Sequence, residues 1–522
     1  MSQMLKSSGA LGAATFTSRV LGLVREIAYA RFMGDGWVAG AFMLAFMVPN
    51  LFRRLLGEGA LTAAFIPIFK EKEKIEGEAE MWRSANAVIS GLIVGATAIV
   101  ILGIILVSIR LWFPFRTEQT FLMFRLLRVM FPYVLLVCLA AILMGMLNAR
   151  GHFFIPAIGA AMLNVVMIAS VFLLAPALGR SLDRQIFGLA IGVVLAGVVQ
   201  AAFQLPMLHK EGFRFRWTSP WRDSTVRRVV RQMLPAAIGV AAYQLNVMFT
   251  QGIAFWVDPT VVASFNYAVR LMELPQGVFG LSLATYLLPT LSGLSAEKKY
   301  DEFRNTLGDG LGYLVFINLL ATVLLVILAE PTIRLLFERG RFDIYSTARA
   351  SLALVYLAPG LLAFSIVNIL ARAFYALGDT TTPMKISVFC LALNAVLTFL
   401  LIFPLRQGGL GVANTLSSVV NVCLLGYALR KKISRVETRS LVQQAPSMVS
   451  AAVIAGAGAW MVDYWYEHFI GHANLVLKTG AVVFPALFAS AIYFAVCWQL
   501  KVPYMKDVSR LIQGLLRRFR RA

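Results

Sequence analysis

Long runs of apolar residues are the feature that most restricts how this chain can fold. A helix needs about 20 apolar residues to cross roughly 30 Å of hydrocarbon, and the sequence contains about fourteen such runs. Inside lipid each crossing segment must satisfy its own backbone hydrogen bonds, which favours α-helices. The runs therefore predict an all-α polytopic membrane protein of about 14 transmembrane helices. Their cores lie near residues 8–30, 37–69, 86–112, 121–148, 154–177, 186–207, 229–256, 260–292, 306–329, 347–377, 384–404, 408–429, 446–465 and 475–499.

Composition excludes the main soluble classes. Of the 522 residues, 59% are hydrophobic and 14% are charged, whereas soluble domains carry about 25% charged residues. A secreted enzyme, a coiled coil and a disordered scaffold are all excluded on this basis. The four cysteines lie inside apolar runs without CxxC or Cys/His spacing, so we expect neither disulfides nor a metal site.

The net charge of +22 comes mainly from basic residues between the apolar runs. Positive loops on the inner side of a membrane and attraction to anionic lipids explain this excess, so membrane lipids are expected partners and nucleic acid is not. The richest segments are residues 208–228, 431–445 and 500–522, which an even helix count places on one side. We therefore predict cytoplasmic termini, a basic cytoplasmic linker at 208–228, a cytoplasmic loop at 431–445 and a basic amphipathic tail at 500–522.

An internal repeat with an offset of 227 residues divides the chain. The same offset relates Pro132 to Pro359, Gly151 to Gly378, and Pro156 to Pro383. We predict two six-helix lobes, residues 1–207 and 229–430, arranged as a parallel pseudo-repeat because six is an even number of crossings. Residues 446–499 then form two extra C-terminal helices outside the repeat.

Charged residues inside the predicted spans need a partner or a wet cavity. A charge at the bilayer centre costs about 2.5–3.5 kcal/mol on insertion scales. These residues cluster in the opening helices of each lobe: Arg19, Arg25, Glu26, Arg53, Arg54, Glu58, Arg270 and Glu273, with Arg372 in a later span.

Two interpretations of the cluster differ in what neutralises it. In the first interpretation the residues form structural ion pairs. The pairs Arg54–Glu58, Arg270–Glu273 and Arg19–Glu26 are each spaced to share a helix face. The arginines nevertheless outnumber the available acids, which favours a water-filled cavity that binds an anion. Arginine suits phosphate or carboxylate because its planar fork donates paired hydrogen bonds. A catalytic site is not expected, since the sequence has no P-loop, HExxH or Gly-x-Ser-x-Gly motif.

Four motifs carry a resemblance to a known family. They are Ser18–Gly22 with Arg25, Pro49–Arg54 followed by Glu58-Gly59-Ala60 and Phe65-Ile66-Pro67, Tyr267–Val278, and Leu335–Gly340. Together they resemble the lipid II flippase family (MurJ/MviN), over roughly residues 5–440. The resemblance implies a fourteen-helix fold of the multidrug/oligosaccharidyl-lipid/polysaccharide exporter superfamily.

The resemblance also implies a function and a site. Such proteins are transporters, not enzymes, and move undecaprenyl-diphosphate-linked disaccharide-pentapeptide across the bacterial cytoplasmic (inner) membrane by alternating access. Cell-wall synthesis proteins are further expected partners. Arg19, Arg25, Arg53 and Arg270 match the family's substrate-binding arginines, with Glu26, Arg54, Glu58, Glu273 and Arg372 as supporting or gating residues. Residues 446–499 match its groove for the lipid tail.

The chain departs from the family pattern at Gly40 and Val269, where many members carry Asp. Its seventh and eleventh predicted helices lack the acids that bind sodium in some members. No cofactor is expected, and sodium, a proton or the membrane potential are alternative driving forces. A polysaccharide-lipid or drug exporter of the same superfamily is the nearest alternative function, and a membrane-embedded polyprenyl-phosphate transferase is a more distant one.

Overall fold

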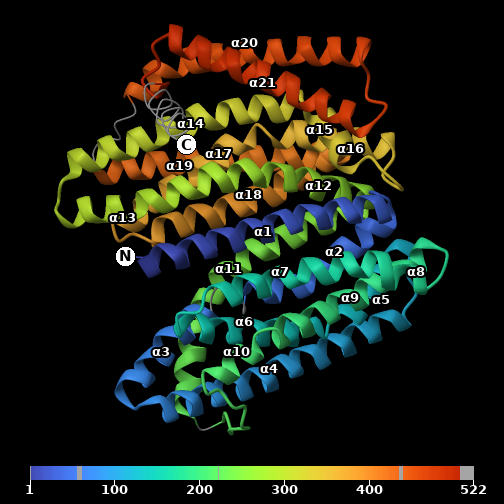
Figure 1. Cartoon of the computed structure of the whole chain (residues 1–522), viewed down its shortest axis with the longest axis vertical. Coiled ribbons are helices and arrows are strands. Elements are labelled where there is room, and N and C mark those ends of the chain that lie inside the picture. The colour runs from blue at the N-terminus through green and yellow to red at the C-terminus, as the bar shows by residue number, and fades with distance from the viewer. Residues whose placement is uncertain (1, 56–60, 222, 434–438, 506–522) are drawn as a thin grey trace. The chain divides into compact units, whose positions relative to one another are not determined.

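The computed structural model describes residues 2–55, 61–221, 223–433 and 439–505, and these residues form helices joined by short loops (Figure 1). Two compact units divide the chain. Unit 1 comprises Met1–Ala263 with Arg339–Phe342, and unit 2 comprises Ser264–Glu338 with Asp343–Ala522. The predicted amphipathic tail falls mostly outside the described residues, and the lobe boundaries at 207 and 229 stay a prediction.

Unit 1 contains α1 (Ser2–Met33), α2 (Trp37–Phe52), α3 (Leu61–Ile75), α4 (Glu78–Trp112), α5 (Glu118–Met130), α6 (Tyr133–Ala149), α7 (Phe154–Ala169), the π-helix η2 (Ser170–Leu174), α8 (Ala175–Ala177), α9 (Leu182–Ala202), α10 (Leu205–Lys210) and α11 (Ser224–Val257). Helix α12 (Pro259–Pro275) begins in unit 1 and ends in unit 2. Unit 2 continues with the π-helix η3 (Gln276–Leu281), α13 (Ser282–Ala296), α14 (Tyr300–Ile327), α15 (Ala329–Phe337), α16 (Ile344–Leu357), α17 (Gly360–Ala376), α18 (Thr381–Leu405), α19 (Gln407–Ile433), α20 (Arg439–Phe469) and α21 (Leu475–Gln499).

The helices confirm a polytopic all-α membrane protein. Among the described residues, ten helices are long and apolar enough to cross a membrane, and two bent pairs bring the number to twelve. The other two expected spans, 8–30 and 229–256, fall on α1 and α11, which are 32 and 34 residues long but carry several charges. The expected fourteen spans are consistent with this arrangement.

Matching bends support the 227-residue repeat. Helices α5 and α6 meet at 44° and α16 and α17 at 45°, and the breaks contain Pro132 and Pro359, whose rings cannot continue a helical hydrogen-bond ladder. Gly151 and Gly378 both have positive φ, 85° and 73°. After them, the amides of residues 152 and 379 donate to the carbonyls of residues 147 and 374, both at 2.9 Å. The two halves therefore end equivalent helices with the same left-handed glycine cap.

The expected helix at 37–69 changes from α-helical to π-helical geometry after Phe52. Helix α2 contains Pro49 and ends at Phe52, residues 53–55 are π-helical, and α3 begins at Leu61 beyond five residues that are not described. In the second half, Pro275 likewise precedes a π-helix, η3. Proline removes a backbone donor and opens the turn, which is a common origin of such breaks.

Each unit has its own apolar core. In unit 1, α3, α4 and α6 bury Phe65, Phe69, Met81 and Met146. In unit 2, one cluster joins α13, α14, α17 and α19, and a second packs α20 and α21 against α14. The hydroxyl of Tyr493 in α21 donates to the carbonyl of Phe316 in α14 at 2.7 Å. The last two helices are thus anchored to the rest of unit 2 (Figure 1).

An ionic network closes one end of unit 1. Arg150, after α6, donates to Glu211 at 2.8 Å and also pairs with Glu73 of α3, while the His152 ring contacts Glu211 at 2.9 Å. The Arg150 hydrogen bond, followed by that of His152, lowers the pKa of Glu211. In unit 2, Lys432 of α19 contacts Asp379 at 2.7 Å, and this contact is the largest cause that lowers the pKa of Asp379. The loop after the glycine cap is therefore tied down by charge in both halves.

Candidate functional site

The predicted arginines lie on helices of both units. Unit 1 holds Arg19 and Arg25 on α1, and Arg53 and Arg54 in the π-turn after α2. Unit 2 holds Arg270 on α12 and Arg372 on α17. Glu58 lies outside the described residues, so its pairing with Arg54 stays a prediction.

Arg25 is fixed by residues of α1 and α7. Its Nη1 donates to Asn164 Oδ1 at 3.0 Å, and its Nη2 donates to Glu26 Oε1 at 2.5 Å. The same Asn164 amide donates to the carbonyl of Ser18 at 3.2 Å. Arg25 and Glu26 have side chains only 11% and 7% exposed, and Arg25 Nε finds no partner among the described residues. The guanidinium is therefore held in one orientation with one donor unused.

Arg19 does not form the expected pair. Glu26 pairs with its neighbour Arg25 instead of with Arg19 two turns away. Arg19 is exposed, and its side chain has no hydrogen bond or ion pair within the described part of the chain. Spacing on a helix face permitted the Arg19 pairing, but the adjacent arginine, oriented by Asn164, takes the carboxylate.

Each arginine after α2 contacts a neutral amide. Arg53 Nε donates to Asn50 Oδ1 at 2.8 Å, and Arg54 Nη1 lies 3.5 Å from Gln244 Oε1 of α11. Both side chains are partly exposed. An amide oxygen accepts a hydrogen bond without cancelling the charge, so each of these contacts orients its guanidinium while leaving it cationic.

Arg270 forms the expected pair within α12. Its Nη1 lies 2.8 Å from Glu273 Oε2, and the two side chains are 42% and 46% exposed. Arg270 lies eleven residues after the start of α12, about 16 Å along the axis, within the helical stretch Pro259–Ala296 that is long and apolar enough to cross a membrane. Arg372 of α17 is partly exposed, and no described residue pairs with its side chain. Exposed charges within membrane-spanning helices require water or a ligand rather than lipid.

Gly40 shows why this chain lacks an aspartate in α2. A Cβ built at Gly40 would lie 2.2 Å from the carbonyl oxygen of Pro259 and 3.0 Å from its carbonyl carbon. Ordinary van der Waals contact begins near 3.4 Å. The close approach of α2 to the start of α12 therefore leaves no space for any side chain at this position. Nothing in the structure explains Val269.

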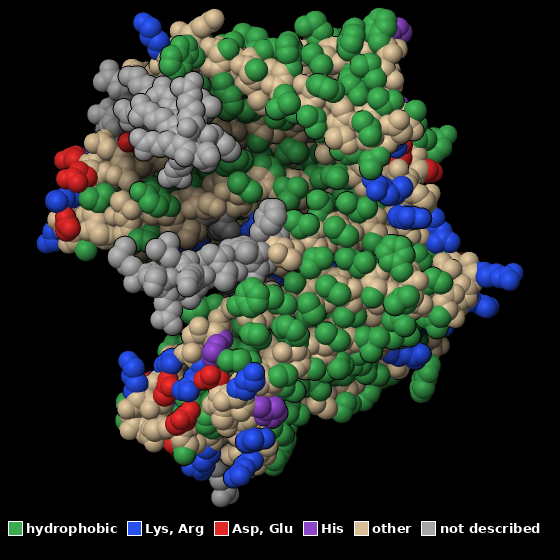
Figure 2. All heavy atoms as spheres, viewed as in Figure 1, with side chains coloured by type: hydrophobic (Ala, Val, Ile, Leu, Met, Phe, Trp, Pro, Cys, Tyr) green, Lys and Arg blue, Asp and Glu red, His purple; other side chains and the backbone are tan. Residues whose placement is uncertain are grey.

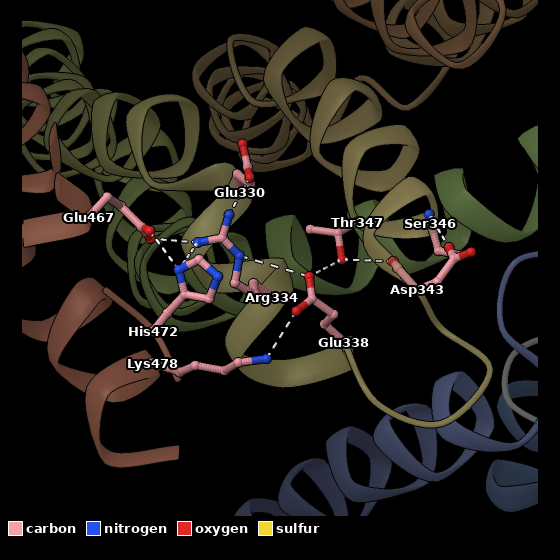
Figure 3. A network of polar contacts seen from close by, with 9 residues as sticks. All are labelled: Glu330, Arg334, Glu338, Asp343, Ser346, Thr347, Glu467, His472 and Lys478. Atoms are coloured by element: carbon pink, nitrogen blue, oxygen red, sulfur yellow. Dashed lines mark hydrogen bonds and ion pairs between the residues drawn. The ribbon is translucent and has the colours of Figure 1, made fainter. Parts of the chain in front are cut away.

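A second charged cluster in unit 2 was not anticipated from the sequence. Arg334 of α15 is 8% exposed and contacts Glu330 on its own helix, Glu467 Oε1 of α20 at 2.5 Å and His472 Nδ1 at 3.2 Å (Figure 3). Lys478 of α21 reaches Glu338 Oε1 at 3.0 Å. These contacts could not be read from the sequence, because partners more than 130 residues away leave no local pattern.

This cluster fixes the end of the α20–α21 pair. His472 Nδ1 lies 2.6 Å from Glu467 Oε2, and since an ionised carboxylate only accepts, that nitrogen donates the proton. Thr347 of α16 donates to Glu338 Oε2 at 2.9 Å. Contacts from α15, α16, α20 and α21 therefore converge on one charged group within unit 2. Among the described residues, no set of three His, Cys, Asp or Glu side chains could hold a metal ion.

The fold and the helix-borne arginines define a class: a polytopic α-helical membrane transporter with cationic groups in its membrane-spanning segments. Comparison of sequences specifies the family. The model of the family described as "Lipid II flippase MurJ" matches residues 29–479. The chain belongs to the MurJ family of lipid II flippases.

Individual relatives agree over nearly the whole length. The chain is 33% identical to a probable lipid II flippase MurJ of Vibrio cholerae over 92% of this chain and 94% of the relative. It is 30% identical to the lipid II flippase MurJ of Burkholderia cenocepacia, over 94% and 96%.

Solved structures share the fold. A lipid II flippase MurJ in an inward closed conformation matches with a TM-score of 0.74 at 22% identity, covering 93% of this chain and 98% of that one. An inward-facing multidrug resistance transporter of the MATE family matches with a TM-score of 0.65 at 16% identity, over 81% and 96%. The predicted superfamily fold is thereby confirmed.

Proposed function

We propose that this protein is a lipid flippase that moves lipid II, the undecaprenyl-diphosphate-linked disaccharide-pentapeptide, from the inner to the outer leaflet of the bacterial cytoplasmic membrane. The carrying observation is that charged side chains on membrane-spanning helices are exposed. Arg270 and its partner Glu273 lie within the candidate span Pro259–Ala296, and each exposes more than two fifths of its side chain. Such groups need a hydrated space, which is what a diphosphate and sugars crossing lipid also need.

Arg19, Arg25, Arg53 and Arg270 form the proposed substrate site, with Glu26, Arg54, Glu58, Glu273 and Arg372 as supporting or gating groups. Amide contacts support this assignment, because Asn164 and Asn50 accept hydrogen bonds from Arg25 and Arg53 and so orient the two guanidinium groups. A diphosphate offers oxygens that match the guanidinium fork in pairs. Glu26 and Glu273 reduce the local charge and so weaken retention of the anion after transport.

The proposed transport cycle is alternating access. The headgroup enters the hydrated space from the cytoplasmic side while the lipid tail stays in the bilayer along α20 and α21. Movement of charged residues through the membrane potential supplies about 2.3 kcal/mol per charge per 100 mV, and this potential is the proposed driving force. We also propose that both termini lie in the cytoplasm and that the protein contacts cell-wall synthesis proteins.

The experiment is depletion and replacement in cells. When the protein is depleted, lipid II should accumulate in the inner leaflet. The measurement is the loss of its accessibility to an externally added probe. Arg19→Ala, Arg53→Ala and Arg270→Ala should each fail to restore export. Arg83→Ala is the matched control, since Arg83 is 65% exposed at the start of α4 and, among the residues that the structure describes, pairs with Glu80 of its own helix.

A variant that preserves the charge tests whether the planar guanidinium geometry of Arg25 is required. Arg25→Lys keeps the charge but cannot reach both Asn164 and Glu26 through a planar fork, so we expect partial export. Wild-type export by all three alanine variants would refute the site, and normal lipid II export after depletion would refute the function. Full export by Arg25→Lys would refute only the requirement for a planar guanidinium group and would leave the proposed function intact.

A further inference from the structure

The segment between α10 and α11 is an irregular linker held on the side of α4. The buried amide of Asn86 donates to the carbonyl of Arg214 at 3.0 Å and accepts from the amide of Arg216 at 3.2 Å. The buried hydroxyl of Ser90 accepts from the amide of Thr218 at 3.2 Å. Pro220 follows the same path, because a Cβ at Gly91 would lie 3.2 Å from its side chain. Two polar side chains of α4 thus bind the linker through its backbone alone.

The side chains of this linker point away from those contacts. Arg214 and Arg216 are exposed, as are Phe215, Trp217 and Trp221, with exposed fractions of 48%, 60% and 74%. We call these five residues the linker surface. Cations and large aromatic rings therefore alternate along a short stretch of chain whose backbone is already satisfied.

The arginines of the linker surface are not neutralised by the protein. Nearby, Arg228 is held by Glu71 through two contacts of 2.8 Å, and Arg150 is held by Glu73 and Glu211. By contrast, the guanidinium groups of Arg214 and Arg216 make no hydrogen bond or ion pair with any residue that the structure describes. Figure 2 shows Lys, Arg, Asp, Glu and His side chains together at the α3 end of unit 1, beyond a surface of hydrophobic side chains.

The position of the linker along α4 sets its depth. Helix α4 has 35 residues, and between Arg83 and Arg110 none is charged, a stretch of about 39 Å. A hydrocarbon core of about 30 Å centred on that stretch begins within a turn of Asn86. The linker therefore runs through the headgroup region and the first turn below it, where Trp and Arg are favoured in membrane proteins.

The linker also replaces lipid over part of α4. Residues 84–90 of α4 are all buried, whereas Leu102 and Leu106 further along are each 57% exposed. Since α4 presents bare apolar side chains in its other half, the surface that meets lipid in this half is the outer side of the linker. Its unneutralised cations match the phosphate of an anionic lipid, and its rings match the acyl boundary.

We propose that the linker surface binds the headgroups of anionic phospholipids and so anchors unit 1 to the leaflet at this end. Arg214 and Arg216 contact the phosphates, while Trp217 and Trp221 insert at the level of the glycerol and upper acyl chains. This site is separate from the proposed lipid II arginines, which lie on other elements.

The test compares Arg214→Ser/Arg216→Ser with the wild type. Purified proteins are placed in nanodiscs of phosphatidylglycerol and phosphatidylcholine and then extracted with mild detergent, and the retained lipids are quantified by mass spectrometry. Each arginine of the linker surface contributes roughly a fivefold preference for anionic lipid, so the loss of both should lower the retained phosphatidylglycerol about 25-fold with unchanged phosphatidylcholine. The backbone contacts to α4 remain, so its melting temperature should match that of the wild type.

Arg180→Ser/Arg184→Ser is the matched control, because it removes the same charge from exposed positions of unit 1 around the start of α9 and should retain phosphatidylglycerol like the wild type. Equal retention in the linker variant, an equal loss in both variants, or a parallel loss of phosphatidylcholine would overturn the proposal. The proposal would also be overturned if the linker variant lost a co-purifying protein while it retained phosphatidylglycerol like the wild type. The wild type supplies an independent measure: retention must fall between about 50 and 500 mM salt, and salt-independent retention would also overturn it.

Discussion

Replacement of Gly40 by alanine should destabilise unit 1 because the added methyl group meets backbone. The Cβ would lie 2.2 Å from the carbonyl oxygen of Pro259, more than 1 Å closer than ordinary contact. A flexible side chain could rotate away, but a carbonyl at the start of α12 moves only if one helix shifts. Overpacking of this kind typically costs about 1–3 kcal/mol.

Helix propensity acts in the opposite direction and must be subtracted. Alanine is favoured over glycine inside a helix by about 1 kcal/mol, so the net loss of stability at Gly40 should be up to about 2 kcal/mol. Gly95→Ala is the matched control: Gly95 lies within α4, and a Cβ added there would have no neighbour within 4 Å. That variant should keep the propensity gain without the clash. Gly40→Asp, which introduces a longer and charged side chain, should be worse than Gly40→Ala.

The assay is thermal unfolding of purified protein in detergent, followed by loss of the monodisperse peak after heating. We expect the order Gly95→Ala, wild type, Gly40→Ala and Gly40→Asp, from most to least stable. A Gly40→Ala protein as stable as Gly95→Ala would refute the reasoning, since it would mean that α2 and the α11–α12 junction are not in rigid contact.

Three further perturbations follow from the same geometry. Glu467→Gln should lower the melting temperature and cost about 2 kcal/mol of unfolding free energy, because the buried Arg334 loses a charged acceptor; an unchanged melting temperature would contradict this. Because the pKa of Glu211 is lowered in the folded protein from its ordinary value of 4.5, its stabilising contribution is present above that value and lost as the pH falls through the folded pKa. Glu211→Gln should therefore flatten the melting-temperature profile below pH 4.5, and an identical profile would count against the network. Gly151→Ala and Gly378→Ala should each cost about 1 kcal/mol through positive φ alone, since their Cβ positions are otherwise open; a difference of several kcal/mol between the two would argue against equivalent caps.

Much of the fold could be predicted because membrane spans are a local property of sequence. A run of apolar residues determines its own secondary structure and its transfer into lipid, without reference to partners. Pro132 and Pro359 marked the repeat correctly, and both lie at bends of nearly equal angle. The π-helical turn at residues 53–55 was not predicted, because it depends on how the chain after Pro49 accommodates its open hydrogen bonds.

The candidate site was predictable only in part. The identity of its arginines follows from the cost of charge in lipid, and the pair Arg270–Glu273 follows from helical spacing. The partner of Arg25 did not follow, because Asn164 lies 139 residues away. Spacing suggested Arg19 for Glu26, yet the carboxylate went to Arg25, which α7 holds in place.

The sequence by itself determined that this chain crosses a membrane many times, in two related halves, with more arginines than acids in its spans, because hydrophobicity, repetition and charge are carried by each residue regardless of its neighbours. Only the tertiary structure decided which arginines are held by amides, which are neutralised and which stay exposed. It also decided that Gly40 has no room for a side chain and that Arg334 joins α15 to α20 and α21. These outcomes depend on distances between helices that are remote in sequence, and packing alone sets those distances.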